Sequence, residues 1–245
     1  IILWVARQLS NEKIKEHDLK TIWRAGFIPG VAIILIFLQP DFGTTATIAF
    51  IVLIQFLFSK TKLIYPALLS IGGWFIGRYF LESEFYRAER LRVWSEGICN
   101  QGQELLGACF QVHQSRIAIS SGGMFGLGPG TSRARWGSLP SAYSDFISSI
   151  IGEEYGFIGY LIFIFILSIC IITFFLIAVR EKNEFKKIFI SGLGAWILFQ
   201  SVLNLGASVY LLPITGIVLP FVSYGGTAMV SIFVALGIMH CRVDE

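Results

Sequence analysis

Runs of apolar residues, separated by short polar stretches, make up most of this chain. A transmembrane helix needs about 20 mostly apolar residues, and about six runs approach that length, while residues 1–9 resemble the end of a further helix. The six runs cover residues 22–38, 44–58, 63–80, 147–179, 188–212 and 217–239. The pattern predicts an all-α, polytopic membrane protein with about six full transmembrane helices plus the end of another, in a single membrane domain over residues 1–245.

Basic residues gather in every second connection between these runs, which predicts the orientation in the bilayer. They are Lys13, Lys15, Lys20 and Arg24, then Lys60 and Lys62, then Arg180, Lys182, Lys186 and Lys187. The connections at residues 40–43 and 212–216 carry none. Because basic loops stay on the cytoplasmic side, the opposite side is expected to hold these two turns and one long loop, residues 81–146.

Composition excludes several classes of protein. The chain is 55% hydrophobic and 14% charged, whereas a soluble domain carries about 25% charged residues. An ordinary cytosolic enzyme, a disulfide scaffold, a disordered region and a collagen are therefore excluded. The formal charge of +3 is too small to indicate a nucleic-acid partner. The four cysteines lack metal-ligand spacing and are predicted to be free thiols, with a Cys99–Cys109 bridge as the alternative.

The long loop at residues 81–146 is where we expect the chemistry. It carries both arginines and acids, and loops of this length translocate largely regardless of charge. It is rich in glycine near residues 122–130, and its apolar interludes favour a packed loop that dips into the membrane. Long loops of this kind are usually functional or disordered.

Asp145 is the first candidate for chemistry. Pro140 suits the start of a helix, and a helix beginning near Ser141 would place Asp145, Ser149 and Glu153 on one face. Ionisable groups at membrane depth are costly and usually functional. The alternative is that Asp145 only complements the positive helix N-terminus. Glu153, further along, is expected to pair with arginines or to cap a neighbouring loop.

Arginines and glycines provide a second set of candidates. Guanidinium groups match the geometry of phosphate, which favours Arg90, Arg92 and Arg116 as ligands of a pyrophosphate; the alternative is snorkelling to lipid head groups. Arg133 and Arg135 follow the glycine run. That run matches neither the dinucleotide fingerprint nor the P-loop, but its glycines allow the backbone to approach a ligand closely.

Three further polar features lie at or inside apolar runs. Asp41 is expected to cap the next helix, with a substrate or cation role as the alternative. Gln200 and Asn204 lie four residues apart, so one helix face carries two amides that join helices or line a cavity. Residues 211–227 contain two prolines and three glycines, which predicts a broken helix at a membrane entrance.

Several colinear blocks of the sequence together resemble the SEDS family (shape, elongation, division and sporulation) of bacterial membrane proteins, which includes FtsW and RodA. They are Gln39-Pro40-Asp41-Phe42-Gly43-Thr44, Gln111 to Ser115 leading into Ser121-Gly122-Gly123, Gly126-Leu127-Gly128-Pro129-Gly130, Leu139-Pro140 to Ser144-Asp145-Phe146 with Gly152-Glu153-Glu154, Gln200 with Asn204, and Leu219-Pro220-Phe221 with Ser223-Tyr224-Gly225-Gly226. Because the family has about ten membrane helices and the chain opens inside an apolar run without Met, the resemblance implies its C-terminal portion.

The sequence departs from the family pattern next to Asp145. Ser141 stands where most relatives have Glu, and Ser144 stands where they have Thr. The first change removes a charge partner, whereas Ser144 keeps a hydroxyl. The Tyr-Ser-Asp-Phe and Gly-Pro-Gly blocks are more similar to FtsW than to RodA.

The resemblance implies a peptidoglycan glycosyltransferase that polymerises lipid II at the outer face of the bacterial cytoplasmic membrane, with Asp145 as general base in an inverting displacement of polyprenyl pyrophosphate. Substrate-binding residues are expected among Arg90, Arg92, Gln111, Ser115, Arg116, Gly122, Gly123, Ser144, Glu153, Asn204, Ser223, Tyr224 and Gly225. A divalent cation (magnesium or manganese) is left open, with Asp145 and Asp41 as candidate ligands.

The expected partners are a class B penicillin-binding protein and other membrane proteins of a cell-division or elongation complex. Two alternatives from other classes remain. A lipid II flippase would fit the broken helices and intramembrane amides, but it would not depend on a carboxylate at the outer face. A non-enzymatic scaffold of the cell-wall synthesis complex would tolerate the loss of Asp145.

Overall fold

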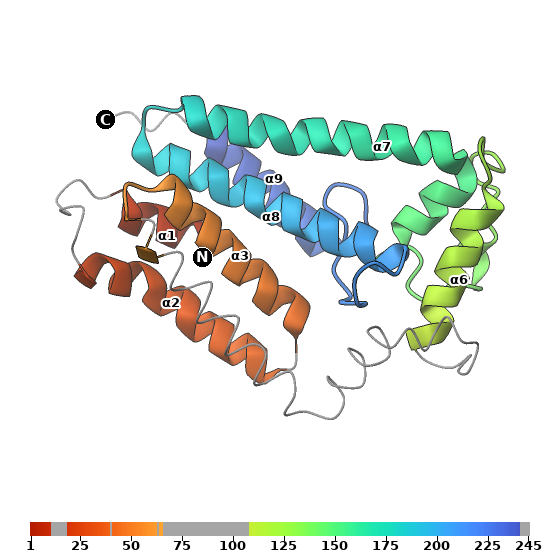
Figure 1. The fold of residues 1–245 in the computed structure, drawn as a ribbon, viewed down its shortest axis with the longest axis horizontal. Helices are drawn as coiled ribbons and strands as arrows, with labels where there is room; N and C mark the ends of the chain where they lie inside the picture. Colours follow the sequence, from red (N-terminus) through yellow and green to blue (C-terminus); the bar gives the residue numbers. More distant parts are fainter. Residues whose placement is uncertain (11–18, 40, 63, 66–107, 241–245) are drawn as a thin grey trace. The chain divides into compact units, whose positions relative to one another are not determined.

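The computed structural model describes residues 1–10, 19–39, 41–62, 64–65 and 108–240. Across these ranges every regular element is helical (Figure 1), which confirms the all-α prediction. The elements are α1 (Ile2–Leu9), α2 (Leu19–Leu38), α3 (Phe42–Phe58), α6 (Ala108–Ser121), the 3-10 helix η2 (Ala134–Trp136), α7 (Ile147–Arg180), α8 (Glu184–Ser208) and α9 (Gly226–His240).

Two of the predicted transmembrane runs form helices that are long and apolar enough to cross a bilayer, α7 and α8. Within their most apolar windows 22% of α7 is buried against 61% of α8, so α7 presents an apolar surface outward while α8 packs inside. Residues Trp23–Leu38, α3 and α9 are shorter apolar helices. The run predicted at 63–80 lies outside the described residues apart from residues 64 and 65.

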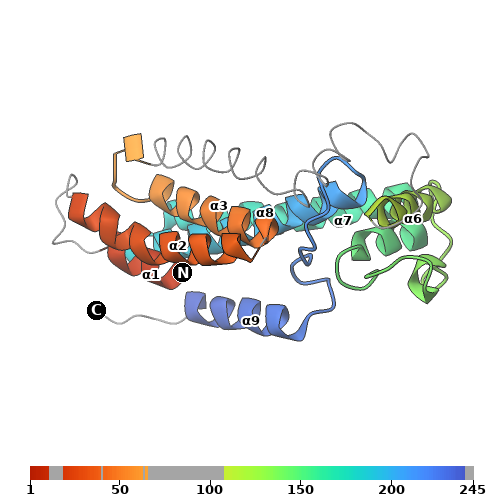
Figure 2. The same ribbon diagram turned by 90° about the horizontal axis from the view of Figure 1, so that it is seen from below.

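The chain divides into two compact units, and the first contains α1, α2, α3, α7 from Cys170, α8 up to Phe199 and α9 from Ser231. α1, α2 and α3 lie side by side (Figures 1 and 2). The core between them is apolar, and the buried Gln55 amide links α3 to Ile2 of α1 at 3.0 Å and to Ile188 of α8 at 3.3 Å. The core side chains are Val5, Ala25, Ile48, Val52 and Phe56.

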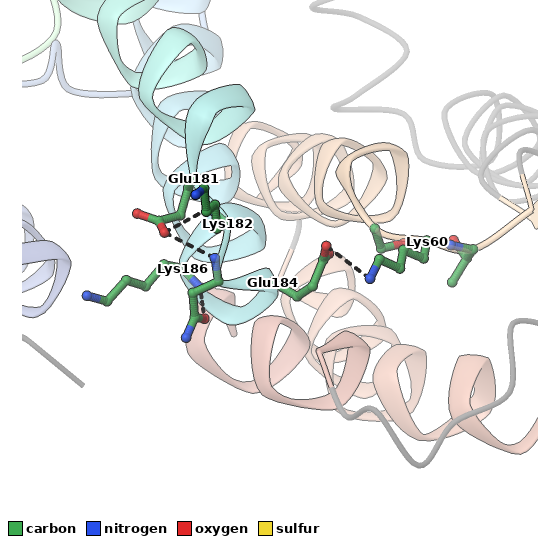
Figure 3. Close-up of polar contacts among 8 residues, drawn as sticks. Lys60, Glu181, Lys182, Glu184 and Lys186 are labelled. Atoms are coloured by element: carbon green, nitrogen blue, oxygen red, sulfur yellow. Dashed lines mark hydrogen bonds and ion pairs between the residues drawn. The ribbon is translucent and has the colours of Figure 1, made fainter. Parts of the chain in front are cut away.

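Two of the connections predicted to be cytoplasmic meet at one end of this first unit. The Lys60 ammonium lies 3.3 Å from the Glu184 carboxylate, and Figure 3 shows this ion pair. The Glu181 carboxylate accepts the backbone N–H groups of Lys182 and Asn183 at 2.9 and 3.1 Å, which orders the turn between α7 and α8. The ion pair agrees with the expectation that these basic loops share one side of the membrane.

The second unit contains the described part of the predicted outer loop, α7 up to Ile169, α8 from Gln200 and the segment up to Val230. Its core is formed by Ala118, Ala134, Leu139, Ala142, Phe146 and Ile150. The 14-residue helix α6, which the sequence did not predict, lies within the loop. Cys109, near the start of α6, is disulfide-bonded, whereas Cys170 is free. The prediction of free thiols is therefore wrong for Cys109.

α7 is interrupted at Gly156, whose φ of 67° and ψ of −170° are not helical. In a continuous helix the N–H groups of Phe157 and Ile158 would donate to the carbonyls of Glu153 and Glu154. They donate instead to Gly123 and Met124 of the loop after α6, at 2.8 and 3.2 Å. The two freed carbonyls accept the N–H groups of Leu127 and Gly128, both at 3.0 Å. The loop thus inserts into the helix ladder and satisfies all four groups, as a break in a membrane helix requires.

Glycines allow the two backbones to approach this closely. A Cβ on Gly126 would lie 2.1 Å from the Glu154 carbonyl oxygen, and one on Gly122 would lie 2.1 Å from the Gly152 carbonyl oxygen. A Cβ on Gly156 would meet the backbone of Phe125 and Gly126 within 2.7 Å. The glycine run therefore docks against the chain's own backbone.

Candidate functional site

Asp145 lies in a tight turn just before α7. The N–H groups of Ser144, Asp145 and Phe146 all point to the Ser141 carbonyl, at 3.2, 3.0 and 3.4 Å. Ser141 has a φ of 55°, a left-handed conformation that a right-handed helix cannot include. The prediction of a helix starting near Ser141 is therefore wrong, because α7 begins at Ile147 and Asp145 precedes it.

Three consecutive carbonyls of this turn accept hydrogen bonds from residues far along the chain. We call the three donors the carbonyl clamp. The Tyr224 N–H donates to the Tyr143 carbonyl at 2.9 Å, and the Ser223 hydroxyl donates to the Ser144 carbonyl at 2.5 Å. The Asn204 side-chain amide donates to the Asp145 carbonyl at 2.8 Å. Asn204 comes from α8, and the other two come from the segment before α9. The clamp fixes the backbone on both sides of the Asp145 side chain.

The clamp residues are themselves anchored. The buried Asn204 amide also donates to the Ile217 carbonyl at 2.8 Å, and the buried Ser223 hydroxyl accepts the Leu219 N–H at 2.7 Å. These bonds hold residues 217–223 in an extended and turning path, so the sixth predicted run does not become helical until Gly226. This corrects the predicted start at residue 217, although the predicted break in residues 211–227 is confirmed.

Within the described parts of the chain the Asp145 carboxylate has no partner. The side chain is half-buried, and among the described residues it accepts no hydrogen bond and meets no cation. Gly216, at a φ of 68°, lies beside it: a Cβ there would be 3.8 Å from Oδ2. No described residue therefore occupies either carboxylate oxygen, and an unoccupied oxygen within reach of a ligand hydroxyl is the first requirement for a general base.

The Glu153 carboxylate, by contrast, is fully occupied by the loop that precedes Asp145. Glu153 is 2% exposed, and its carboxylate accepts the Ser132 hydroxyl at 2.5 Å and the N–H groups of Arg133 and Ala134 at 3.1 and 3.2 Å. A longer contact of 3.4 Å joins it to the Ser121 hydroxyl. The expectation that Glu153 caps a neighbouring loop is confirmed.

Ser115 is also committed to the structure of the unit. It is fully buried, and its hydroxyl lies 2.7 Å from the Ser149 hydroxyl and donates to the Ser208 carbonyl at 2.6 Å. These contacts join α6, α7 and α8. The Ser115 hydroxyl is therefore used in packing these helices together and is not exposed to a ligand.

The remaining predicted binding residues are dispersed. On α6, Gln111 is half-buried and Arg116 is exposed. Gly122 is buried against α7, Gly123 is exposed at a φ of 55°, and Ser144 and Gly225 are half-buried. Arg90 and Arg92 lie outside the described residues. Tyr224 has its side chain 84% exposed next to the clamp.

Asp41, the second candidate metal ligand, caps α3. Its Oδ1 accepts the Thr44 N–H at 3.0 Å and its Oδ2 accepts the Thr44 hydroxyl at 2.6 Å. The capping interpretation is confirmed. Within the described ranges no three His, Cys, Asp or Glu side chains gather to form a metal site.

Sequence reasoning did not identify Gly216 and Gly156 as parts of the site. Gly216 lies beside Asp145 in a conformation that suits glycine, and Gly156 receives the inserted loop. For Gly216 the available signal was its place within an expected break, whereas Gly156 was only a glycine inside a predicted apolar run. Neither signal carries information about the distant backbone each residue meets.

Comparisons of the sequence with known proteins show the family to which the chain belongs. The sequence profile described as a cell cycle protein and covering FtsW, RodA and SpoVE matches residues 1–244. A probable peptidoglycan glycosyltransferase FtsW of Bacillus subtilis is 37% identical over 215 residues, 84% of this chain and 52% of the relative. The stage V sporulation protein E of the same organism is 31% identical over 247 residues, 98% of this chain and 64% of the relative.

Two solved structures share the fold. One belongs to a study of the coordination of polymerization and crosslinking by a peptidoglycan synthase complex; it has a TM-score of 0.69 at 20% identity and covers 97% of this chain and 66% of that one. The other is a mutant of the Thermus thermophilus rod shape determining protein RodA, with a TM-score of 0.60 at 21% identity, covering 100% of this chain and 64% of that one. The chain spans about half of the Bacillus subtilis FtsW relative and under two thirds of the sporulation protein.

Proposed function

Because the chain belongs to the FtsW/RodA/SpoVE family of cell cycle proteins, which is the SEDS family that its motifs resemble, we propose that it is a peptidoglycan glycosyltransferase that polymerises lipid II. Relatives that are 37 and 31% identical are named probable peptidoglycan glycosyltransferases. The observation that carries the proposal is the Asp145 carboxylate, which is unpaired among the described residues and stands on a backbone hydrogen-bonded on both sides.

The proposed reaction is a single displacement at a sugar carbon. The 4-hydroxyl of the GlcNAc of one lipid II attacks C1 of the MurNAc of the growing strand, and Asp145 takes the hydroxyl proton. The bond from C1 to the diphosphate oxygen breaks, and the polyprenyl diphosphate leaves with the bonding electrons. The α-linked donor becomes a β-1,4 product, so one general base is sufficient. A base in this position contributes about 10²–10⁴-fold to the rate.

The carbonyl clamp supplies the positional accuracy that this step needs. A base acts only within hydrogen-bond reach of the hydroxyl, and small displacements cost large factors in rate. Asn204, Ser223 and the Tyr224 N–H hold the carbonyls of three consecutive residues. In this proposal Asn204 and Ser223 are positioning residues that act through the Asp145 backbone.

A divalent cation remains a prediction. Magnesium keeps several waters and takes one or two carboxylates together with substrate phosphates. The Asp145 carboxylate fits such a site as its single protein ligand, whereas the Asp41 carboxylate is occupied by Thr44. A bound cation would neutralise charge on the departing diphosphate.

We place the site at the outer face of the bacterial cytoplasmic membrane. The basic connections at Lys60 and Lys186 mark the opposite, cytoplasmic side. The disulfide at Cys109 agrees with this, since disulfides persist in oxidising compartments outside the cytosol. Because a structure of the same fold belongs to a complex that couples polymerization with crosslinking, the proposed partner is a class B penicillin-binding protein within a division or elongation complex.

The contacts of the broken helix weaken the flippase alternative. A transport pathway uses unwound backbone and intramembrane polar groups to bind its cargo. Here the break at Gly156 has its four freed groups bonded to the loop, and the Asn204 amide nitrogen is bonded to Asp145 and Ile217. A scaffold, in turn, would not need a carboxylate held in place without a partner.

Reconstituted full-length protein with its transpeptidase partner tests the three functions together. We expect glycan strands from lipid II with the wild-type protein and none with Asp145→Asn, at equal expression and melting temperature. Movement of a fluorescent lipid II across the bilayer without glycan synthesis would identify a flippase. Unchanged cell-wall assembly with Asp145→Asn would identify a scaffold.

A further inference from the structure

Arg135 lies on a segment that is rigidly attached to the site. The Glu153 carboxylate holds the N–H groups of Arg133 and Ala134, and the Arg135 N–H donates to the Ser132 hydroxyl at 3.3 Å. That hydroxyl is itself bonded to Glu153 at 2.5 Å. The backbone of Arg135 is therefore fixed by a buried carboxylate on α7.

The Arg135 side chain is held by two aromatic rings. Its guanidinium carbon lies 5.8 Å from the centroid of Trp136 and 6.0 Å from that of Tyr143, within the range of cation–π attraction. Its Nε donates to the Tyr143 hydroxyl at 3.4 Å, and that hydroxyl donates back to the Arg135 carbonyl at 3.4 Å. The guanidinium is oriented before any ligand arrives.

The same side chain keeps its capacity to bind an anion. A guanidinium has five N–H donors in a planar fork, and toward the described residues only the Nε of Arg135 donates a hydrogen bond. Among the described residues no carboxylate pairs with Arg135. A cation that is oriented, exposed and without an acidic partner is suited to a phosphate oxyanion, which a guanidinium binds with two parallel bonds.

Arg135 is also tied to the reacting end of the site. Tyr143, which holds the guanidinium, lies two residues before Asp145, and its carbonyl is bound by the clamp at Tyr224. The rings of Trp136, Tyr143 and Tyr224 are 79, 47 and 84% exposed. Exposed aromatic rings of this kind lie at the level of lipid head groups.

We propose that Arg135, oriented by Trp136 and Tyr143, binds the diphosphate of the lipid-linked substrate beside Asp145. The inference rests on the proposed function and assigns one of its binding contacts. An ordinary membrane phospholipid offers the same phosphate chemistry to an arginine at this depth. The test must therefore distinguish a substrate ligand from a lipid anchor.

Arg133 provides the matched control. It is two residues away on the same exposed segment, and its backbone is held by the same Glu153 carboxylate. No ring contact or ion pair orients its guanidinium within the described part of the chain. Arg133→Gln removes the same charge as Arg135→Gln without removing an oriented donor.

The test measures the binding of polyprenyl diphosphate, without sugar, to the full-length protein in a nonionic detergent free of phospholipid. We expect Arg135→Gln to raise the Kd about tenfold or more and Arg133→Gln to change it less than about twofold. Arg135→Lys, which keeps the charge but not the fork, should fall between them. An equal Kd for wild type and Arg135→Gln overturns the inference. So does a loss that appears only when phosphatidylglycerol is added, because it identifies a lipid anchor.

Kinetics separate this inference from the proposed function. In lipid II polymerisation Arg135→Gln should raise KM more than it lowers kcat, and Tyr143→Phe should show a smaller change of the same kind. If the wild type binds the diphosphate through Arg135 yet makes no glycan, the proposed function fails and the inference stands. If glycan synthesis depends on Asp145 but Arg135→Gln leaves both Kd and KM unchanged, the inference fails alone.

Discussion

Two carboxylates eight residues apart, Asp145 and Glu153, have opposite surroundings. At Asp145 the backbone is bonded on both sides and the carboxylate is unpaired among the described residues. At Glu153 the side chain is buried, and its carboxylate accepts the Ser132 hydroxyl and two backbone N–H groups. The first arrangement leaves the Asp145 carboxylate available to a ligand. The second uses the Glu153 carboxylate to hold the loop in place.

The difference shows which acid is available for chemistry. Spacing along the sequence predicted both residues on one polar face, with Asp145 as the base and Glu153 pairing with arginines or capping a loop. A carboxylate that satisfies several buried donors is bound to the fold, since each donor it abandoned would be left unpaired. A carboxylate whose neighbouring carbonyls are fixed can meet a substrate without reorganisation.

The largest expected effect on stability is at Glu153. Glu153→Ala leaves the N–H groups of Arg133 and Ala134 and the Ser132 hydroxyl without an acceptor, at a cost of about 3 kcal/mol or more. Asp145→Ala should change stability by less than about 0.5 kcal/mol, because no contact is lost among the described residues. Melting temperatures in detergent check this pair, and similar losses in the two variants would contradict the comparison.

Insertion of the glycine loop into α7 gives the next effect. Gly126→Ala should destabilise the protein by about 2 kcal/mol or more, because its Cβ would meet the Glu154 carbonyl at 2.1 Å. Gly123→Ala is the control: it also has a positive φ but open space around it, so a cost of roughly 1 kcal/mol is expected. Thermal unfolding of the two variants measures the difference, and equal costs would mean that the loop does not insert.

Loss of a clamp hydroxyl should lower both stability and rate, because Ser223 also accepts the buried Leu219 N–H. Ser223→Ala removes the donor to the Ser144 carbonyl and lets the Asp145 turn shift, so kcat should fall about tenfold with little change in KM. Ser138→Ala is the control, because it removes an exposed hydroxyl bonded to the Arg133 carbonyl in the same loop. Steady-state lipid II kinetics test this. A change in KM alone would make Ser223 a substrate ligand.

A change in the first compact unit, which contains neither carboxylate, should have the smallest effect. Glu184→Gln breaks the ion pair with Lys60, whose side chain is 70% exposed, and such pairs contribute about 0.2–1 kcal/mol. Glycan synthesis should be unchanged. Parallel melting and activity measurements provide the baseline for the other variants, and a large loss of activity would show that the basic turn serves the site.

The length of the apolar runs predicted where the long helices α7 and α8 lie. The run at 147–179 became α7 with bounds within one residue, and the break in residues 211–227 and the cap at Asp41 were also predicted. These features depend on local signals: apolar length, proline, glycine and a capping side chain. The family resemblance rested on such local blocks as well.

The site itself depends on contacts that no local pattern records. The Asp145 turn was mistaken for a helix because Pro140 and four-residue spacing favour one, whereas Ser141 adopts a positive φ and the clamp comes from residues 204–224. α9 starts late for the same reason, since Asn204 and Ser223 hold residues 217–223 outside a helix. Helix α6 was missed because polar residues interrupt its apolar positions.

The most direct test of the account is the rate of lipid II polymerisation by Asp145→Asn, measured on protein whose melting temperature has been shown to equal that of the wild type. Asparagine keeps the size of the side chain and leaves the clamped backbone unchanged, but it cannot accept a proton. We expect the rate to fall by about 10²–10⁴-fold. A well-folded Asp145→Asn protein that makes glycan within about threefold of the wild-type rate would show that the carboxylate is not the base.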